Sequence, residues 1–456
     1  MARPAAGAGR QAQIAGLLLT ALAGALGGGG GCAHPGPPPG GPPRLKPAVI
    51  LRTRPDSGAV IPDFRGSAVI TFDEVIDEMP ASGGGRSTGG AISGLASKIV
   101  LSPVAGDVNV SWHRDEIHVE PDEGWKANRV YHLEVLPGIM DLRRNATKTG
   151  KTIVFSTGGA VPGAALTGTV LLWVEQRQLT QGVIRAALLP DTVAYITLTD
   201  SAGNFRLRDI PPGRYQVWAI QDQNNNRRPD RRELFDTVTA TVDSTATVLL
   251  WAFAHDTVGP RVRSIDPVDS VSLRITFSQS LDPARQLDTA AVRVFVLPDS
   301  TPVPVRALYR AAVFDSLQAR ARAIADSIKR QQDSLKRLQD TTARRDTTAR
   351  RDTARVREAP PTPPAPVQPR GPAARARADT AAHVDTARVR KLLSQRPVPY
   401  DRLVVQTARP LTAGSKYLVR VRGAVSLSGV AGDGLGVVQI PVPKPVARDT
   451  TKGKSP

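Results

Sequence analysis

Short runs of alternating apolar and polar residues, each closed by turn-forming residues, extend along the chain from Val49 onward. Residues 68–72, 116–119 and 131–135 are examples. An alternation with a period of two places every second side chain on the same face of a β-strand. Antiparallel strands of this kind typically pack one face on a core and expose the other to water. Many such strands at close spacing predict an all-β fold built from sandwiches.

Two parts of this pattern repeat each other. A short motif, T-F followed by I-D or L-D at the same spacing, occurs at residues 71–77 and again at 276–282. Downstream, six positions align without a gap: Ile117, Val119, Trp125, Tyr131, Leu133 and Val135 with Leu403, Val405, Leu411, Tyr417, Val419 and Val421. The sequence therefore predicts one module used twice. We interpret Tyr131 and Tyr417 as core residues whose hydroxyl groups bond nearby backbone, as is frequent in Ig-like sandwiches.

The length and the charge of the chain limit its possible folds and binding partners. A chain of 456 residues with 39 Pro and 40 Gly is too long for one sandwich and too interrupted for long helices, so we expect three modules. The net charge of +19 is spread among interleaved basic and acidic residues. Because no helix-turn-helix, zinc-finger or aromatic RNA-binding pattern accompanies this charge, we expect no nucleic-acid partner.

The repeated module resembles a known family. Its first copy, residues 47–159, carries four short motifs: P-D-S at 55–57, T-F-x-x-x-I-D at 71–77, P-G-I-M-D at 137–141 and F-S-T at 155–157. In this order they resemble the bacterial Ig-like domain of S-layer proteins of the SbsA type. The second copy, residues 258–310 plus 398–443, lacks the last two motifs and is split by an insertion at 311–397. The resemblance implies a spacer or adhesive module, in a family not known for catalysis.

A different module lies between the copies. Residues 200–207 read D-x-x-G-x-F-x-L and residues 213–217 read G-x-Y-x-V. Asp200 and Gly203 favour a turn, while Phe205 and Leu207 alternate toward a core. The pattern resembles the transthyretin-like, carboxypeptidase regulatory-like β-sandwich, with residues 163–255 as its extent. The resemblance implies an accessory module without peptidase chemistry.

This middle module ends in the best candidate for site chemistry. In the segment 222–233, oxygen-bearing side chains follow the spacing of an EF-hand calcium loop: Asp222, Asn224, Asn226, Asp230 and Glu233. Arg227 occupies the sixth position, where the sharp turn requires glycine, and the four arginines of the segment would repel a divalent cation. Asp-rich and Asn-rich sequences are also ordinary turns. A weak calcium site and a plain connecting loop both remain open.

Other catalytic or metal patterns are weaker. Residues 113–116 spell H-x-x-E, the zinc spacing of carboxypeptidases, but they fall at a predicted hairpin with only His118 nearby, so we interpret them as surface. The sequence has no phosphate-binding glycine loop or H-E-x-x-H helix. We therefore expect that the protein is not an enzyme.

The first residues read as an export signal. Arg3 and Arg10 precede an apolar run at 14–26 that is too short to cross a bilayer, and small residues follow up to Cys32. Residues 1–31 are thus a predicted signal peptide. Cys32, the only cysteine, lies where a lipobox places its acylated cysteine, although Gly29 stands where a lipobox usually has Leu. The alternative is a cleaved signal with an incidental cysteine. Residues 32–46, rich in Pro and Gly, read as a flexible tether.

The insertion has a helical pattern of its own. Apolar residues recur at spacings of three, four and seven: Phe314, Leu317, Ala321, Ile324, Ile328, Leu335 and Leu338. This stripe fits a coiled-coil seam, which Gln331 interrupts, or a helix that lies against its own sandwich. Beyond Asp340, D-T-T-A-R-R repeats and the Pro-rich stretch 359–372 predict disorder, as does the tail 444–456.

These features together predict a non-catalytic, lipid-anchored protein of the bacterial cell envelope. It would act as a structural spacer or an adhesive array of binding modules, with the membrane as a partner through Cys32. Envelope polysaccharide or other envelope proteins are further expected partners, and calcium is the one cofactor considered. The alternative is an accessory, polysaccharide-binding or peptide-binding component of an envelope hydrolase system.

Overall fold

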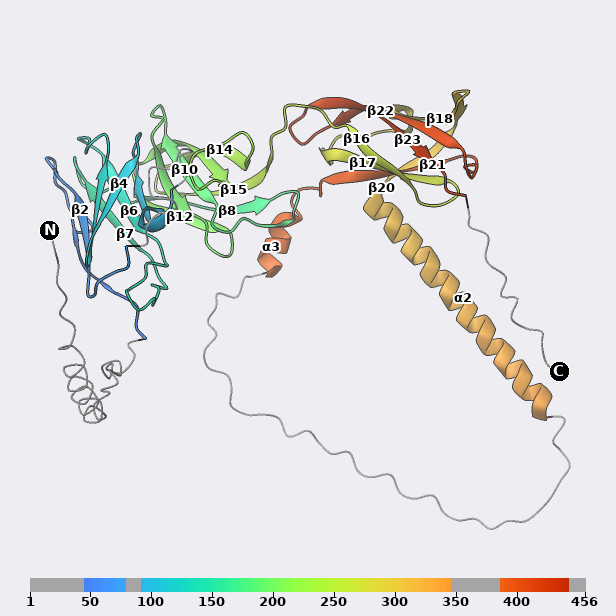
Figure 1. Cartoon of the computed structure of the whole chain (residues 1–456), viewed down its shortest axis with the longest axis horizontal. Helices are drawn as coiled ribbons and strands as arrows, with labels where there is room; N and C mark the ends of the chain where they lie inside the picture. Colours follow the sequence, from blue (N-terminus) through green and yellow to red (C-terminus); the bar gives the residue numbers. More distant parts are fainter. Residues whose placement is uncertain (1–44, 79–91, 346–385, 443–456) are drawn as a thin grey trace, which may run out of the picture.

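The computed structural model describes residues 45–78, 92–345 and 386–442. The predicted signal peptide, Cys32, most of the tether, residues 346–385 of the insertion and the tail lie outside the described residues. Figure 1 shows three β-sandwiches in chain order and one long helix that projects from the last of them. The architecture confirms the prediction of an all-β chain of tandem sandwiches with a helical insertion.

The first module is a sandwich of two antiparallel sheets. Its strands are β1 (Ile50–Arg54), β2 (Ala68–Phe72), β3 (Ile99–Ser102), β4 (Val108–His113), β5 (Glu116–Pro121), β6 (Val130–Val135) and β7 (Lys151–Ser156), with a 3-10 turn η1 (Gly94–Lys98) before β3. One sheet has the order β1-β2-β5-β4 and the other β3-β6-β7. Alternate residues of both sheets meet in a core where Phe72, Tyr131 and Phe155 are almost fully buried. Trp125 packs edge-on against Tyr131, with 4.9 Å between ring centroids.

The third module repeats this topology. Its strands are β16 (Val262–Pro267), β17 (Ser272–Leu281), β18 (Val292–Leu297), β19 (Thr301–Val303), β20 (Val305–Arg310), β21 (Tyr400–Thr407), β22 (Lys416–Val425) and β23 (Ala431–Gln439), with a 3-10 turn η2 (Thr289–Ala291) before β18. The sheet orders β16-β17-β21-β20 and β19-β18-β22-β23 match those of the first module, with β19 added. Lys126 N donates to the Tyr131 hydroxyl at 2.7 Å and Thr412 N to the Tyr417 hydroxyl at 2.8 Å. The predicted repeat and the predicted role of both tyrosines are confirmed.

The middle module is a sandwich of a different order. Its strands are β8 (Ala164–Leu172), β9 (Arg177–Gln178), β10 (Val183–Leu188), β11 (Ala194–Leu198), β12 (Asn204–Ile210), β13 (Gly213–Ile220), β14 (Leu234–Val242) and β15 (Thr245–Ala254). They run β11-β10-β13-β14-β15-β8-β12, and β14 pairs with β15 at only two positions, so the ladder folds into two layers. The predicted turn is present, because Asp200 Oδ1 accepts bonds from Ala202 N and Asn204 N, and Gly203 has a φ of 75°. Phe205 and Leu207 are buried.

The insertion replaces a hairpin turn. In the first module only Arg114 and Asp115 separate β4 from β5, whereas in the third module the matching strands β20 and β21 are separated by the whole insertion. It contains the helices α2 (Ala311–Arg345) and α3 (Thr386–Leu393). None of the helices in the described ranges has the length and apolar character that a membrane crossing requires.

Only the first turns of α2 contact the sandwich. Phe314 is buried, Asp315 pairs with Arg274, and Gln318 Nε2 donates to Asp269 Oδ2 at 3.3 Å. Beyond these residues α2 projects away from its module (Figure 1). The alternative in which the helix lies along its own sandwich is therefore wrong past Gln318, because the helix axis leaves the sheet surface instead of following it.

Candidate functional site

The first and middle modules share a buried junction. The sheet β3-β6-β7 faces the sheet β11-β10-β13 across an apolar cluster made of Val100, Val183, Ile196 and Ile220, with Leu136, Leu198, Trp218 and Phe235 packed against it. Val100 is 1% exposed and Ile220 is fully buried. Burial of this apolar area holds the two modules together. We treat this junction as the candidate functional site, because it determines how the modules are placed relative to one another.

The junction corrects one expectation from the sequence. The alternation at residues 131–135 predicted that the second face of this strand meets water, but His132 is 4% exposed and Glu134 is half-buried beneath the middle module. The polar side chains find protein partners there. Glu134 Oε2 accepts a bond from Thr197 Oγ1 at 3.1 Å, and His132 Nε2 lies 3.3 Å from the Asp209 carbonyl oxygen.

Burial changes the ionisation of these groups. Desolvation lowers the pKa of His132 from 6.5 to about 4, because the apolar surroundings disfavour the charged ring. Desolvation also raises the pKa of Glu134, against the opposing effect of its hydrogen bond from Thr197. Ser102 Oγ completes the polar contacts of this region by accepting from Ile196 N at 3.0 Å. The junction therefore favours a neutral imidazole.

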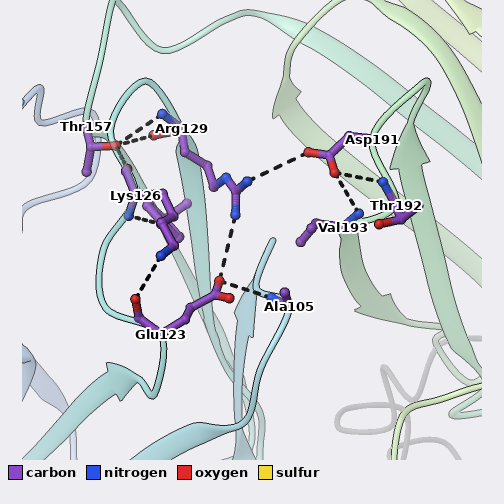
Figure 2. A network of polar contacts seen from close by, with 9 residues as sticks. Ala105, Glu123, Lys126, Arg129, Thr157, Asp191, Thr192 and Val193 are labelled. Carbon is purple, nitrogen blue, oxygen red and sulfur yellow. Dashed lines mark hydrogen bonds and ion pairs between the residues drawn. The ribbon is translucent and has the colours of Figure 1, made fainter.

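A polar network closes one edge of the junction. Figure 2 shows the Arg129 guanidinium between Glu123 of the first module, at 3.8 Å, and Asp191 of the middle module, at 3.7 Å. Thr157 Oγ1 fixes the backbone of Arg129, accepting from its N–H and donating to its carbonyl oxygen. The Asp191 carboxylate also accepts from two N–H groups of its own turn, so both ends of this bridge are held in place.

The segment 222–233 supplies the other edge. Arg227 reaches into the first module, where Nη1 donates to the Ile99 carbonyl oxygen at 2.6 Å and Nη2 to the Ser97 carbonyl oxygen at 2.7 Å. Desolvation lowers the pKa of Arg227, and the two carbonyl groups offset part of the cost of burying its charge. Nearby, Arg228 pairs with Asp107 at 2.9 Å. The contacts of Arg227 and Arg228 therefore hold the segment 222–233 of the middle module against the first module.

The oxygens predicted to bind calcium mostly accept bonds from the loop itself. Asp222 accepts from Asn226 N at 3.1 Å through Oδ1 and from Arg227 N at 2.8 Å through Oδ2. Asn224 Oδ1 also accepts from Asn226 N. Arg227 adopts a φ of 56°, so it makes the left-handed turn that an EF-hand loop assigns to glycine.

The second half of the loop is split between surface and core. Asp230 is exposed, and its Oδ1 accepts from Arg232 N at 3.3 Å. Glu233 is 3% exposed, and its Oε1 accepts from Gln223 N at 2.9 Å, whereas its Oε2 is buried without a hydrogen-bond partner. Across the described ranges, no three side chains of His, Cys, Asp or Glu are grouped closely enough to hold a metal ion. Binding of calcium would require the carboxylates of the loop to move closer together.

Comparison with known proteins bears on the first module. Residues 45–157, which contain all strands from β1 to β7, match the family described as bacterial Ig-like domain. This module is a bacterial Ig-like domain. The match confirms that residues 45–157 resemble bacterial Ig-like domains, as their sequence motifs indicated. The search of curated proteins gave no match.

Several solved structures show weak similarity to the chain. The major pilin subunit of Bacillus cereus has 10% identity, with 43% of this chain and 67% of the pilin covered and a TM-score of 0.17. A protein of Bacteroides uniformis described as a candidate carbohydrate-binding protein has 9% identity, with 61% and 100% covered and a TM-score of 0.16. Native alpha-2-macroglobulin of Escherichia coli, over domains MG0-NIE-MG1, has 12% identity, with 56% and 84% covered and a TM-score of 0.17. Similarities this low carry no argument.

The H-x-x-E motif of the Ig-like domain lies at a surface hairpin, as predicted. His113 ends β4 and is exposed, and Glu116 begins β5. His118 Nε2 lies 3.2 Å from Glu116 Oε2, and the two histidine rings are 6.2 Å apart. Glu116 and His118 form a polar pair on one strand, β5, and His113 of β4 lies opposite Glu116.

The junction partners of the Ig-like domain were missed by the sequence reasoning. A signal was nevertheless present in residues 99–102, I-V-L-S, which form β3 and are all buried. An apolar run without alternation is typical of a strand covered on both faces. That signal predicts a neighbour on the outer face of the Ig-like domain, although it does not identify which module supplies it.

A second junction joins the middle module to the end of the insertion. The Arg396 guanidinium carbon lies 5.3 Å from the ring centroids of both Trp173 and Trp251. Trp173 Nε1 donates to the Pro397 carbonyl oxygen at 3.1 Å. Cation-π contacts of this kind contribute about 0.5 to 2 kcal/mol each. The chain that returns from the insertion to β21 is therefore fastened to the middle module, far from the Ig-like domain.

We predict weak binding of calcium at the loop 222–233. With a Kd of about 0.1 to 1 mM, typical of extracellular modules, millimolar calcium should stabilise the folded chain by about 0.5 to 1.5 kcal/mol. Thermal unfolding with calcium or with chelator measures this shift. Glu233→Gln retains the bond from Gln223 N but removes the negative charge, so it should abolish the shift. Asp243→Asn, outside the loop, is the control, and a wild-type midpoint that ignores calcium would show that the loop is only a turn.

Proposed function

We propose that the protein is a non-catalytic spacer of the bacterial cell envelope, attached to lipid through Cys32. In this role the Ig-like domain and the middle module form one stiff unit that carries the third module and α2. The observation that carries the proposal is the junction between the first two modules. Domains joined only by a linker move relative to each other, whereas an apolar, hydrogen-bonded interface restrains them.

The contacts of this junction are distributed so as to resist bending. The apolar cluster around Val100 lies between two polar edges, one made by Arg129 and the other by Arg227. Bending toward the Arg129 edge would break the charge-assisted hydrogen bonds of Arg227, which contribute about 1.5 to 3 kcal/mol each, and bending toward the Arg227 edge would lengthen the ion pair between Arg129 and Asp191. The contacts of Arg396 with two tryptophans restrain the next junction in the same way.

The positions of the aromatic residues also favour a role as a spacer rather than as a sugar-binding module. Platforms that bind sugar rings need exposed Trp or Tyr faces, and the five tryptophans of the chain are all engaged in packing. In the Ig-like domain, Trp112 and Trp125 pack on the core and donate to backbone carbonyl groups. Trp218 packs in the junction, and Trp173 and Trp251 hold Arg396.

The predicted tether sets the distance to the membrane. Its fifteen residues, 32–46, could span at most about 50 Å when fully extended. A Pro-rich and Gly-rich chain of this length would leave the stiff unit free to tilt, while keeping it near the bilayer. In the proposed spacer, the tether therefore allows movement relative to the membrane, whereas the first two modules stay fixed relative to each other.

Metabolic labelling with a palmitate analogue tests the attachment. We expect wild-type protein to incorporate the label and to sediment with membranes, and Cys32→Ala to do neither, because acylation requires the thiol. Lys46→Ala, at the end of the tether, is the control and should behave as wild type. Equal labelling of wild type and Cys32→Ala, with both proteins released in soluble form, would leave only a cleaved signal with an incidental cysteine.

A further inference from the structure

The long helix α2 carries an apolar stripe that is largely exposed among the described residues. Leu317, Ile324, Ile328 and Leu335 are 47%, 61%, 50% and 60% exposed. A solitary helix of 35 residues gains little stability from helix propensity alone, and most helices depend on packing of their apolar face. Four large aliphatic side chains at regular intervals on one projecting helix therefore require a partner.

The spacing of the stripe identifies the type of partner. From Phe314 to Leu338 the seam positions alternate strictly between steps of three and four residues, which is a heptad period of 3.5. A helix that packs on a globular surface shows a wider face with a period of 3.6, whereas a narrow 3.5 seam is typical of helices that supercoil around one another. The stripe thus fits a second helix with the same period.

The residues beside the seam permit two copies of α2 to meet. The flanking positions are nearly uncharged: Gln318, Arg320, Ala325, Ser327, Gln332 and Ser334. In a parallel pair Arg320 faces Ala325 of the second copy, so like charges do not oppose each other across the seam. The remaining basic residues from Arg322 to Arg337 lie on the outer side of the helix, where Asp326 and Asp333 accompany them.

One polar seam position specifies the orientation. Gln331 occupies a seam position between Ile328 and Leu335. In a parallel, in-register pair it lies opposite Gln331 of the second copy, and two amides can hydrogen-bond each other. In an antiparallel pair it would lie opposite an apolar side chain, leaving a buried amide without a partner, which costs about 1 to 3 kcal/mol. A single polar residue in a seam commonly fixes register in this way.

We propose that two copies of this chain associate through α2 as a parallel, in-register coiled coil that begins at Leu317. The root of each helix is already fixed to its own sandwich by Phe314, Asp315 and Gln318, so the seam begins where those contacts end. The dimer does not depend on the proposed lipid attachment. It places two third modules side by side at the N-terminal end of the coil.

Sedimentation of the full chain carrying Cys32→Ser tests the association without a contribution from lipid. We expect a mass twice that of the 48.5 kDa chain. Adding Ile324→Asp and Ile328→Asp should halve the measured mass, because two carboxylates would enter the seam. The matched change Ala323→Asp and Lys329→Asp puts the same residues on the outer side of the helix and should leave the dimer intact. A monomeric parent, or equal loss of the dimer in both variants, would overturn the proposal.

Cross-linking tests the orientation. In the Cys32→Ser background, Gln331→Cys should form a disulfide between copies upon mild oxidation, because the two positions are adjacent in a parallel pair. Asp333→Cys, on the outer side of the helix, should remain reduced. A dimer in which Gln331→Cys does not cross-link would exclude the parallel, in-register arrangement.

Discussion

Replacement of Val100 by aspartate is expected to separate the Ig-like domain from the middle module, at a cost of about 3 to 5 kcal/mol. Val100 is 1% exposed and belongs to the apolar cluster of the junction, not to the core of its own domain. The cluster offers a carboxylate no cationic partner, and the neighbouring Arg227 guanidinium already donates to the Ser97 and Ile99 carbonyl groups. The domain itself should still fold, because the opposite face of β3 supplies its core residues Ile99 and Leu101.

Calorimetry and small-angle scattering would detect this separation. The wild-type pair of modules should unfold in one cooperative transition, and the variant in two, with an increased radius of gyration as the modules move apart. Val49→Asp, at a position that is 58% exposed, is the matched control and should resemble wild type. A single transition with an unchanged midpoint in Val100→Asp would mean that the junction contributes little and that the spacer is not stiff.

Acidification is expected to weaken the same junction through His132. Its pKa is about 4 when buried and 6.5 when free, so the separated state binds the proton more tightly. The stability contributed by the neutral ring is complete above about pH 6.5 and is lost as the pH falls toward 4. At about 1.4 kcal/mol per pKa unit, the full loss approaches about 3 kcal/mol.

Protonation of Glu134 has the opposite effect on the stability of the junction, so the contribution of His132 must be measured separately. Burial raises the pKa of Glu134, so protonation of this group favours the closed junction as the pH falls through its raised pKa. Unfolding midpoints of wild type and His132→Gln between pH 7 and pH 4.5 isolate the histidine, because glutamine can still donate to the Asp209 carbonyl group but does not titrate. We expect the variant to lose most of the dependence on pH. If the unfolding midpoints of the two proteins depend on pH to the same extent, His132 does not cause the pH dependence.

The sheets and the repeat could be predicted because alternation records which face of a strand is apolar. Residues 71–77 and 276–282 occupy the same place in the two sandwiches, and Tyr131 and Tyr417 have the same backbone contact. The junction could not be predicted in the same way. A polar residue such as His132 on the second face of a strand has the same sequence signal whether water or another module surrounds it.

The loop 222–233 shows a second limit of prediction from the sequence. The spacing of Asp222 and Glu233 predicts where oxygens fall along the chain, but it does not say which donors reach them first. Backbone N–H groups of the loop use both oxygens of Asp222, and the side chain of Arg227 leaves the loop for the Ig-like domain. Only the fold brings the Ser97 and Ile99 carbonyl groups within reach of this side chain.

The position of the insertion has a consequence for how such a chain can change. Because the insertion connects the paired strands β20 and β21, lengthening it costs the sandwich only about 0.6 kcal/mol of closure entropy for each doubling. The helix could therefore be extended, shortened or exchanged by mutation with little penalty for the fold. The length of the insertion at this hairpin can therefore change during evolution while the β-sandwich that carries it stays the same.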